Sequence, residues 1–184
     1  MRNSILAVLL ITGILLIGTQ SIAQDKAAHK YVGVSMCAPC HKAEKQGKQF
    51  DIWKASKHSE AFNVLATPKA DSIAKAKGLK TAAKASPECL KCHTTAADAK
   101  PAMIAASFKQ TDGVQCETCH GPGSDYKSIT VMKDKEKAVA AGLTIFKEDP
   151  KLCTTCHNSE SPTFKEFKYD EMWGKIKHSI PKKG

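Results

Sequence analysis

Cys37-Ala38-Pro39-Cys40-His41 is the first of four C-x-x-C-H motifs, and these motifs decide how the chain folds. C-x-x-C-H is the attachment signature of c-type haem. The two cysteines bind the porphyrin edge through thioethers, and the adjacent histidine becomes the proximal ligand of the iron. The motifs use every cysteine, so we predict four covalent haems. Their attachment residues are Cys37 and Cys40, Cys89 and Cys92, Cys116 and Cys119, and Cys153 and Cys156, and their proximal ligands are His41, His93, His120 and His157.

Other uses of paired cysteines fit this pattern poorly. A zinc ribbon has no need of a histidine after every second cysteine, and a thioredoxin-like site uses a single C-x-x-C. A disulfide framework would not repeat one spacing so strictly.

The N-terminus has the pattern of a secretory signal peptide. A short positive start is followed by the apolar run Ile5 to Gly18 and by small residues up to Ala23, and this run is short for a transmembrane span. We expect residues 1–23 to be removed and residues 24–184 to form one tetrahaem cytochrome c domain, with no stable membrane insertion afterwards. An uncleaved anchor is the alternative. Covalent haem attachment in bacteria takes place outside the cytoplasmic membrane, so we expect the protein to be periplasmic or exported further.

The formal net charge is +10, and almost all of the positive charge is lysine, since Arg2 is the only arginine. Part of this excess offsets the eight propionates of four haems. Nucleic-acid binding is not expected, because no arginine remains in the mature chain to contact phosphate or guanine in a bidentate way. We expect redox partner proteins with an acidic docking surface instead.

The pattern favours a mainly α fold with extensive irregular loops and no substantial sheet, built around the four haems. Aromatic residues are few, so the porphyrins must supply much of the apolar core. We predict helices over Lys42–Leu65, Ala70–Lys77, Ala96–Phe108, Lys133–Ala141 and Lys168–His178, with the helix over Ala96–Phe108 interrupted by Pro101. We also predict a tight turn at Gly121-Pro122-Gly123.

A six-coordinate haem needs a distal ligand, usually histidine or methionine. Three histidines lie outside the motifs, so at least one of four irons lacks a histidine from its own chain. His58 and His178 are the preferred distal ligands because aromatic residues flank both. His29 precedes Cys37 too closely to reach its own haem easily, and it is a candidate across a subunit contact. Met132 is the methionine candidate, with simple packing as its alternative.

Three segments of the chain resemble the cytochrome c-554 family of tetrahaem electron-transfer cytochromes. They are Trp53 to Phe62, Gly113-Val114-Gln115-Cys116-Glu117-Thr118-Cys119-His120-Gly121-Pro122-Gly123, and Phe167 to Met172 followed by His178.

This resemblance implies a mostly helical fold with haems in two stacked pairs. It also implies that His58 ligates the fourth haem and His178 the third, and that the second haem is open on its distal side. In that family the loop after the third motif supplies a histidine to the first haem. Here Met132 occupies the nearest comparable place. Ser161-Pro162-Thr163-Phe164 resembles a segment that covers the second haem.

We expect an electron-transfer protein rather than an enzyme. Two alternatives remain open. An open haem would allow reduction of nitric oxide or another nitrogen oxide. Polymerisation, with His29 bound to the next subunit, would give an extracellular conductive filament, so the oligomeric state is open as well.

Overall fold

The computed structural model describes residues 29–146 and 149–178, and the expected signal peptide, residues 1–23, lies outside this part of the chain. The described chain is mainly helical, which confirms the predicted fold class, and its extended pairing is a single parallel bridge between Tyr31 and Ile104. Six short 3-10 helices connect the longer elements. The α-helices are α1 (Ala38–His41), α2 (Gln49–Ala55), α3 (Pro68–Ala76), α4 (Pro87–His93), α5 (Cys116–His120), α6 (Ile129–Met132), α7 (Lys135–Ala140), α8 (Pro150–Thr154) and α9 (Tyr169–Ile176).

Three of the predicted helices are confirmed. The helix expected over Ala70–Lys77 is α3, which begins with the Thr67 side chain accepting a hydrogen bond from the Ala70 N–H at 3.2 Å. The helix expected over Lys133–Ala141 is α7, and it is followed by Gly142 at a φ of +99°. The helix expected over Lys168–His178 is α9.

The other local predictions were wrong in part. The long helix expected over Lys42–Leu65 is divided, because Gly47 ends a 3-10 turn in the left-handed conformation before α2 begins. Ala96–Phe108 is mostly irregular, with one 3-10 turn at Pro101–Met103. Gly121-Pro122-Gly123 has no turn hydrogen bond of its own. The chain turns just after it, where the Lys127 N–H donates to the Gly123 carbonyl at 3.0 Å.

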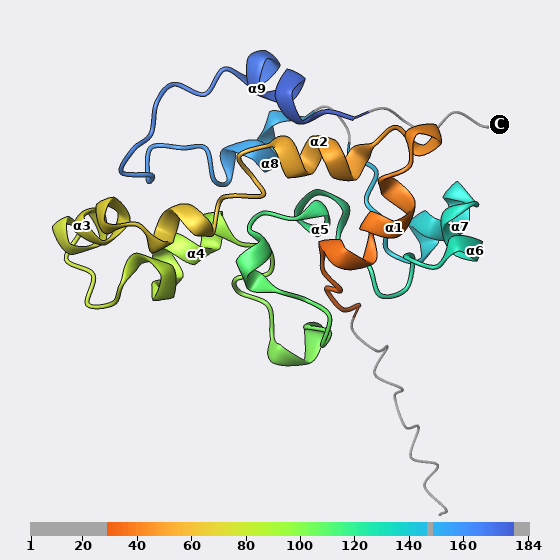
Figure 1. Cartoon of the computed structure of the whole chain (residues 1–184), viewed down its shortest axis with the longest axis horizontal. Coiled ribbons are helices and arrows are strands. Elements are labelled where there is room, and N and C mark those ends of the chain that lie inside the picture. Colours follow the sequence, from red (N-terminus) through yellow and green to blue (C-terminus); the bar gives the residue numbers. More distant parts are fainter. Residues whose placement is uncertain (1–28, 147–148, 179–184) are drawn as a thin grey trace, which may run out of the picture.

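The helix that carries the third motif lies at the centre of the molecule (Figure 1). α3 and α4 lie on one side of α5, and α6 and α7 lie on the other, while α2, α8 and α9 run along one edge. Among the helices that the structure describes, none has the length and apolar character needed to cross a bilayer.

The apolar core formed by side chains is thin. Its main cluster is made by Leu65, Ala74 and Ala83, with Leu79 and Leu90 packed against it. Several large apolar side chains are exposed instead: Met36, Val64, Ile129, Val139, Ile145, Phe164 and Met172. Small side chains bury little area, and hydrophobic stabilisation is roughly 25 cal/mol per Å² buried.

We therefore expect the polypeptide to be largely unfolded without covalent haem. A variant of the mature chain with all eight cysteines replaced by serine should show a far-UV circular dichroism spectrum of a mostly unfolded chain and no cooperative thermal transition. The haem-loaded protein, measured in the same buffer, is the control. A cooperative melt of the serine variant would contradict this expectation.

Candidate haem-binding site

Each motif lies on or beside a short helical turn. α1, α4 and α5 contain the first three histidines, and α8 leads into the fourth motif. Residues three and four apart lie on one face of a helical turn. This spacing brings the two cysteines and the histidine of a motif to the same side. None of the eight cysteines, all within the described residues, forms a disulfide.

Three of the four motif histidines have an acceptor at Nδ1. His41 faces Gln49 Oε1 at 3.3 Å, His93 faces the Ala61 carbonyl at 2.6 Å, and His120 faces the Thr144 carbonyl at 3.0 Å. An acceptor at Nδ1 fixes the tautomer in which Nε2 carries the lone pair for a metal. The fourth histidine, His157, stacks on the Phe167 ring with centroids 4.8 Å apart. These contacts restrain the orientation of all four motif imidazoles.

Two of the predicted distal histidines lie opposite motif histidines. The ring centres of His58 and His157 are 6.2 Å apart, and those of His178 and His120 are 5.8 Å apart. With metal–nitrogen bonds of about 2 Å, two imidazoles that bind one metal from opposite sides hold their ring centres about 6 Å apart. Both separations therefore leave room for one iron between each pair of rings.

The backbone around His58 is held by the segment that precedes the third motif. The Val114 N–H donates to the His58 carbonyl at 3.0 Å, and the Val114 carbonyl accepts from Trp53 Nε1 at 2.7 Å. Gly113 has a φ of +75°, and a Cβ added there would lie 2.5 Å from the His58 carbonyl oxygen. A residue with a side chain at position 113 therefore cannot leave His58 where it is.

Burial lowers the pKa of His58, and the nearby His157 lowers it further. Burial also lowers the pKa of His157. Both effects favour the neutral imidazole, because a charged ring is poorly solvated in a buried site. Neutral imidazole is the form that ligates a metal.

Contacts between cysteines show which motifs are neighbours. The Cys37 thiol interacts with the Cys116 thiol, and this contact together with burial raises the pKa of Cys37. Burial, the Cys156 charge and contact with the Cys156 thiol raise the pKa of Cys92 to about 11. The first motif therefore lies against the third, and the second lies against the fourth.

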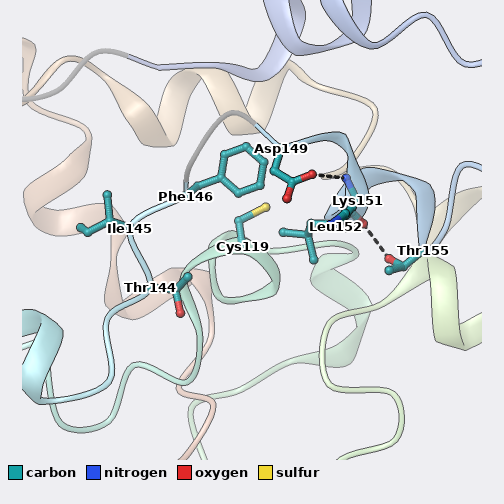
Figure 2. Close-up of a pocket in the computed structure, with 8 residues that line it drawn as sticks. All are labelled: Cys119, Thr144, Ile145, Phe146, Asp149, Lys151, Leu152 and Thr155. Atoms are coloured by element: carbon teal, nitrogen blue, oxygen red, sulfur yellow. Dashed lines mark hydrogen bonds between the residues drawn. The ribbon is translucent and has the colours of Figure 1, made fainter.

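The third and fourth motifs also approach each other across an open hollow. Burial, followed by the Cys153 charge, raises the pKa of Cys119 to about 11. Cys119 points into a hollow of about 520 Å³ (Figure 2), with Phe146 and Leu152 beside its sulfur. Cofactor clefts commonly measure roughly 300–1,000 Å³ and are lined mainly by apolar side chains. The remaining lining residues are Thr144, Ile145, Asp149, Lys151 and Thr155.

Comparison with known proteins agrees with this geometry. The family model described as "Cytochrome c554 and c-prime" matches residues 36–121, which include the first three motifs. Cytochrome c-554 of Nitrosomonas europaea is 28% identical over 194 residues, which cover 86% of this chain and 77% of that protein. The chain is therefore similar to the cytochrome c-554 family, over its first three motifs in the family model and over most of its length in this relative. No solved structure matches.

This similarity supports a c-type cytochrome, an electron carrier with covalently bound haem c. The side chains around the hollow suit that cofactor. Trp173 packs against Phe146 with ring centres 5.0 Å apart and ring planes tilted by 40°. Its indole N–H is buried without a hydrogen-bond partner among the described residues. A buried donor needs an acceptor, and a haem propionate would be one.

The remaining predicted site residues occupy different parts of the cytochrome. His29 Nδ1 pairs with Asp125 Oδ2 at 2.8 Å on the surface, and the ring lies against Gly142. Met132, half-buried, ends α6. Among the described residues, neither His29 nor Met132 makes a ring contact or a hydrogen bond with a motif histidine.

The segment Ser161-Pro162-Thr163-Phe164 follows a loop that is tied to the second motif. Lys91, within that motif, forms a salt bridge with Glu160 at 2.8 Å, and Lys77 Nζ donates to the Glu160 carbonyl at 3.4 Å. The segment itself is mostly exposed, including Phe164.

Sequence reasoning missed the residues that support the histidines. Gln49 and the carbonyls of Ala61 and Thr144 are found only from the fold, since an acceptor at the right place can come from any residue. Gly113 is a glycine shortly before a motif, and this position is only a weak indication that the backbone there approaches another segment closely. Trp173 lies close to His178 in the sequence, but the sequence does not show that its indole N–H is buried.

Gly113→Ala is expected to displace His58 and to alter one haem. Because the added Cβ meets the His58 carbonyl, the variant should show the same new high-spin component as His58→Ala in absorption and electron paramagnetic resonance spectra. Gly78→Ala is the matched control, since Gly78 has the same φ of +75° with no atom within 4 Å of an added Cβ.

The control should lose stability, by about 1–2 kcal/mol for the left-handed conformation, and keep the wild-type spectrum. A wild-type spectrum in Gly113→Ala, or the same spectral change in both glycine variants, would contradict the role of Gly113.

Proposed function

We propose that this protein is a tetrahaem electron-transfer cytochrome of the periplasm, or of a compartment beyond it. The observation that carries the proposal is the pairing of two histidines outside the motifs with motif histidines, at 6.2 and 5.8 Å between ring centres. A second support is that C-x-x-C-H motifs use all eight cysteines. Haem supplies the one-electron chemistry, and the polypeptide sets ligation, spacing and exposure.

In this proposal His157 and His58 ligate the fourth iron, and His120 and His178 ligate the third. The contacts of Gln49 with His41 and of Ala61 with His93 support these histidines as proximal ligands of the first and second irons. Met132 is the proposed distal ligand of the first iron, and the second is open or weakly ligated. His29 is kept as a candidate ligand for a neighbouring molecule.

The neighbouring thiols support two pairs of close haems. The first and third motifs meet at Cys37 and Cys116, and the second and fourth meet at Cys92 and Cys156. Thioether sulfurs mark the porphyrin edge, so motifs whose sulfurs interact hold haem edges close together. The approach of Cys119 to Cys153 links the two pairs. Such an arrangement suits transfer from one end of the molecule to the other.

The partners are proposed to be redox proteins that dock through acidic surfaces. The chain has a formal net charge of +10, carried almost entirely by lysine. Lysine side chains near a haem edge attract an acidic partner over a range of about 8–10 Å at moderate salt. Electron-transfer contacts are small and transient, and such charges act mainly on the rate of association.

The haem count is tested by intact mass. Protein exported from a strain able to attach haem should exceed the mass of residues 24–184 by four haem masses, because each motif binds one group. The same measurement shows whether the signal segment is removed. A smaller gain, or bound zinc in place of haem, would overturn the tetrahaem assignment.

Methionine ligation of the first iron is tested by Met132→Ala. Thioether ligation raises the reduction potential relative to two histidines, so the wild-type redox titration should contain one component well above the others. The variant should lose this component and the far-red absorption band of an iron–methionine bond. Met103→Ala is the matched control and should change neither. Four equivalent bis-histidine haems in the monomer would contradict the assignment, and the same result only in an assembled polymer would favour His29 as the missing ligand.

A further inference from the structure

Glu117 is a buried carboxylate inside the third attachment motif. It lies between Cys116 and Cys119, and only 2% of its surface is exposed. Its Oε1 accepts from the Val32 N–H at 2.9 Å and from the Gly123 N–H at 2.7 Å. Its Oε2 accepts from the Gly33 N–H at 2.8 Å. All three partners are donors, and an ionised carboxylate is the acceptor-only form that satisfies them.

The surrounding backbone is shaped around this group. A Cβ added at Gly123 would lie 3.0 Å from Glu117 Oε1 and 3.1 Å from the Val32 side chain. The Val32–Gly33 segment also leads directly into the first motif at Cys37. The carboxylate therefore joins the chain before the first motif to the chain within and after the third.

A neutral side chain also bonds to this N-terminal segment. The neighbouring residue Gln115 is equally buried, accepts from the Val34 N–H at 2.7 Å and donates to the Lys109 carbonyl at 2.8 Å. A neutral amide thus holds the same N-terminal segment from the other side of Cys116. Burying an ionised group costs free energy even when it is hydrogen-bonded. Unlike the neutral amide of Gln115, the Glu117 carboxylate also exerts the field of a net charge on its surroundings.

The field of this charge reaches the first and third attachment sites. After burial, the Glu117 charge is the next cause of the raised pKa of Tyr31 and of Tyr126. It also contributes to the raised pKa of Cys37. The corresponding positions of the other motifs are Ala38, Leu90 and Thr154, and none of them carries a charge.

We propose that Glu117 is a fixed buried anion that lowers the reduction potentials of the haems on the first and third motifs, and that it does so for both because Cys37 and Cys116 adjoin. This inference rests on the proposed tetrahaem function. A negative charge stabilises the ferric state over the ferrous state, and a buried charge acts through a low effective dielectric. Salt screens such a charge far less than it screens surface lysines.

The test is a redox titration of the haem-loaded Glu117→Gln protein. The amide oxygen can retain the Oε1 position and its two bonds, whereas the amide NH₂ group faces the Gly33 N–H. We expect two of the four components to move to higher potential and two to stay. The shift should be the same at low and high ionic strength. Intact mass and electron paramagnetic resonance spectra should show four haems with wild-type ligation.

Two further variants separate charge from structure. Glu117→Asp keeps the anion but disturbs the hydrogen bonds, and Gln115→Ala removes the neutral contacts to the same segment. Both should leave the two potentials close to wild type. If either raises them as much as Glu117→Gln does, the position is structural and the proposal is wrong. An unchanged titration in a four-haem Glu117→Gln protein would also overturn it.

If the Glu117→Gln protein attaches fewer than four haems, the redox titration of the Glu117→Asp protein tests the proposal instead. Wild-type potentials in a four-haem Glu117→Asp protein support the anion, and raised potentials overturn it. A wild-type protein with fewer than four haems would instead contradict the proposed function, and intact mass tells these outcomes apart.

Discussion

The buried hydrogen bonds of residues 113–123 join segments of the chain that are far apart in the sequence. This segment carries the third motif at the centre of the molecule (Figure 1). Before the motif, Val114 holds the backbone of His58 and the Trp53 side chain. Within the motif, Glu117 holds the segment that leads to Cys37. One short stretch thus fixes parts of three attachment sites relative to each other.

Such dense backbone bonding replaces what a larger apolar core would do in another protein. Buried polar side chains are nearly as many as buried apolar ones in the described chain, and Gln115 and Glu117 are among the largest that are fully buried. A hydrogen bond to a charged group contributes about 1.5–3 kcal/mol, and it is directional, so it fixes positions that small apolar contacts would leave loose. In electron transfer, position matters because the rate depends on the separation of the redox groups.

The sequence predicts which residues could bind haem, but it does not predict the contacts that support those residues. The C-x-x-C-H spacing is local, so it identifies cysteines and proximal histidines without knowledge of the fold. His58 and His178 followed from scarcity and from aromatic neighbours. The Nδ1 acceptors of His41, His93 and His120 could not be predicted from the sequence. They come from residues outside the motifs, and two of the three are backbone carbonyls. The helix predicted over Lys42–Leu65 was too long because Gly47 interrupts it, and the segment around Pro101 forms a 3-10 turn where a helix was expected on both sides.

Glu117 shows why a residue can be quoted in a motif and still be overlooked. Within C-x-x-C-H the two intervening positions are free, and a glutamate there looks like a solvated charge, since glutamate is rarely buried without a partner. Only the fold shows that three backbone donors surround it. Surface lysines and this buried anion therefore act on different targets. The lysines meet partners through water and salt, whereas the anion acts within the protein, where screening is weak and its effect on nearby haem is fixed by the fold.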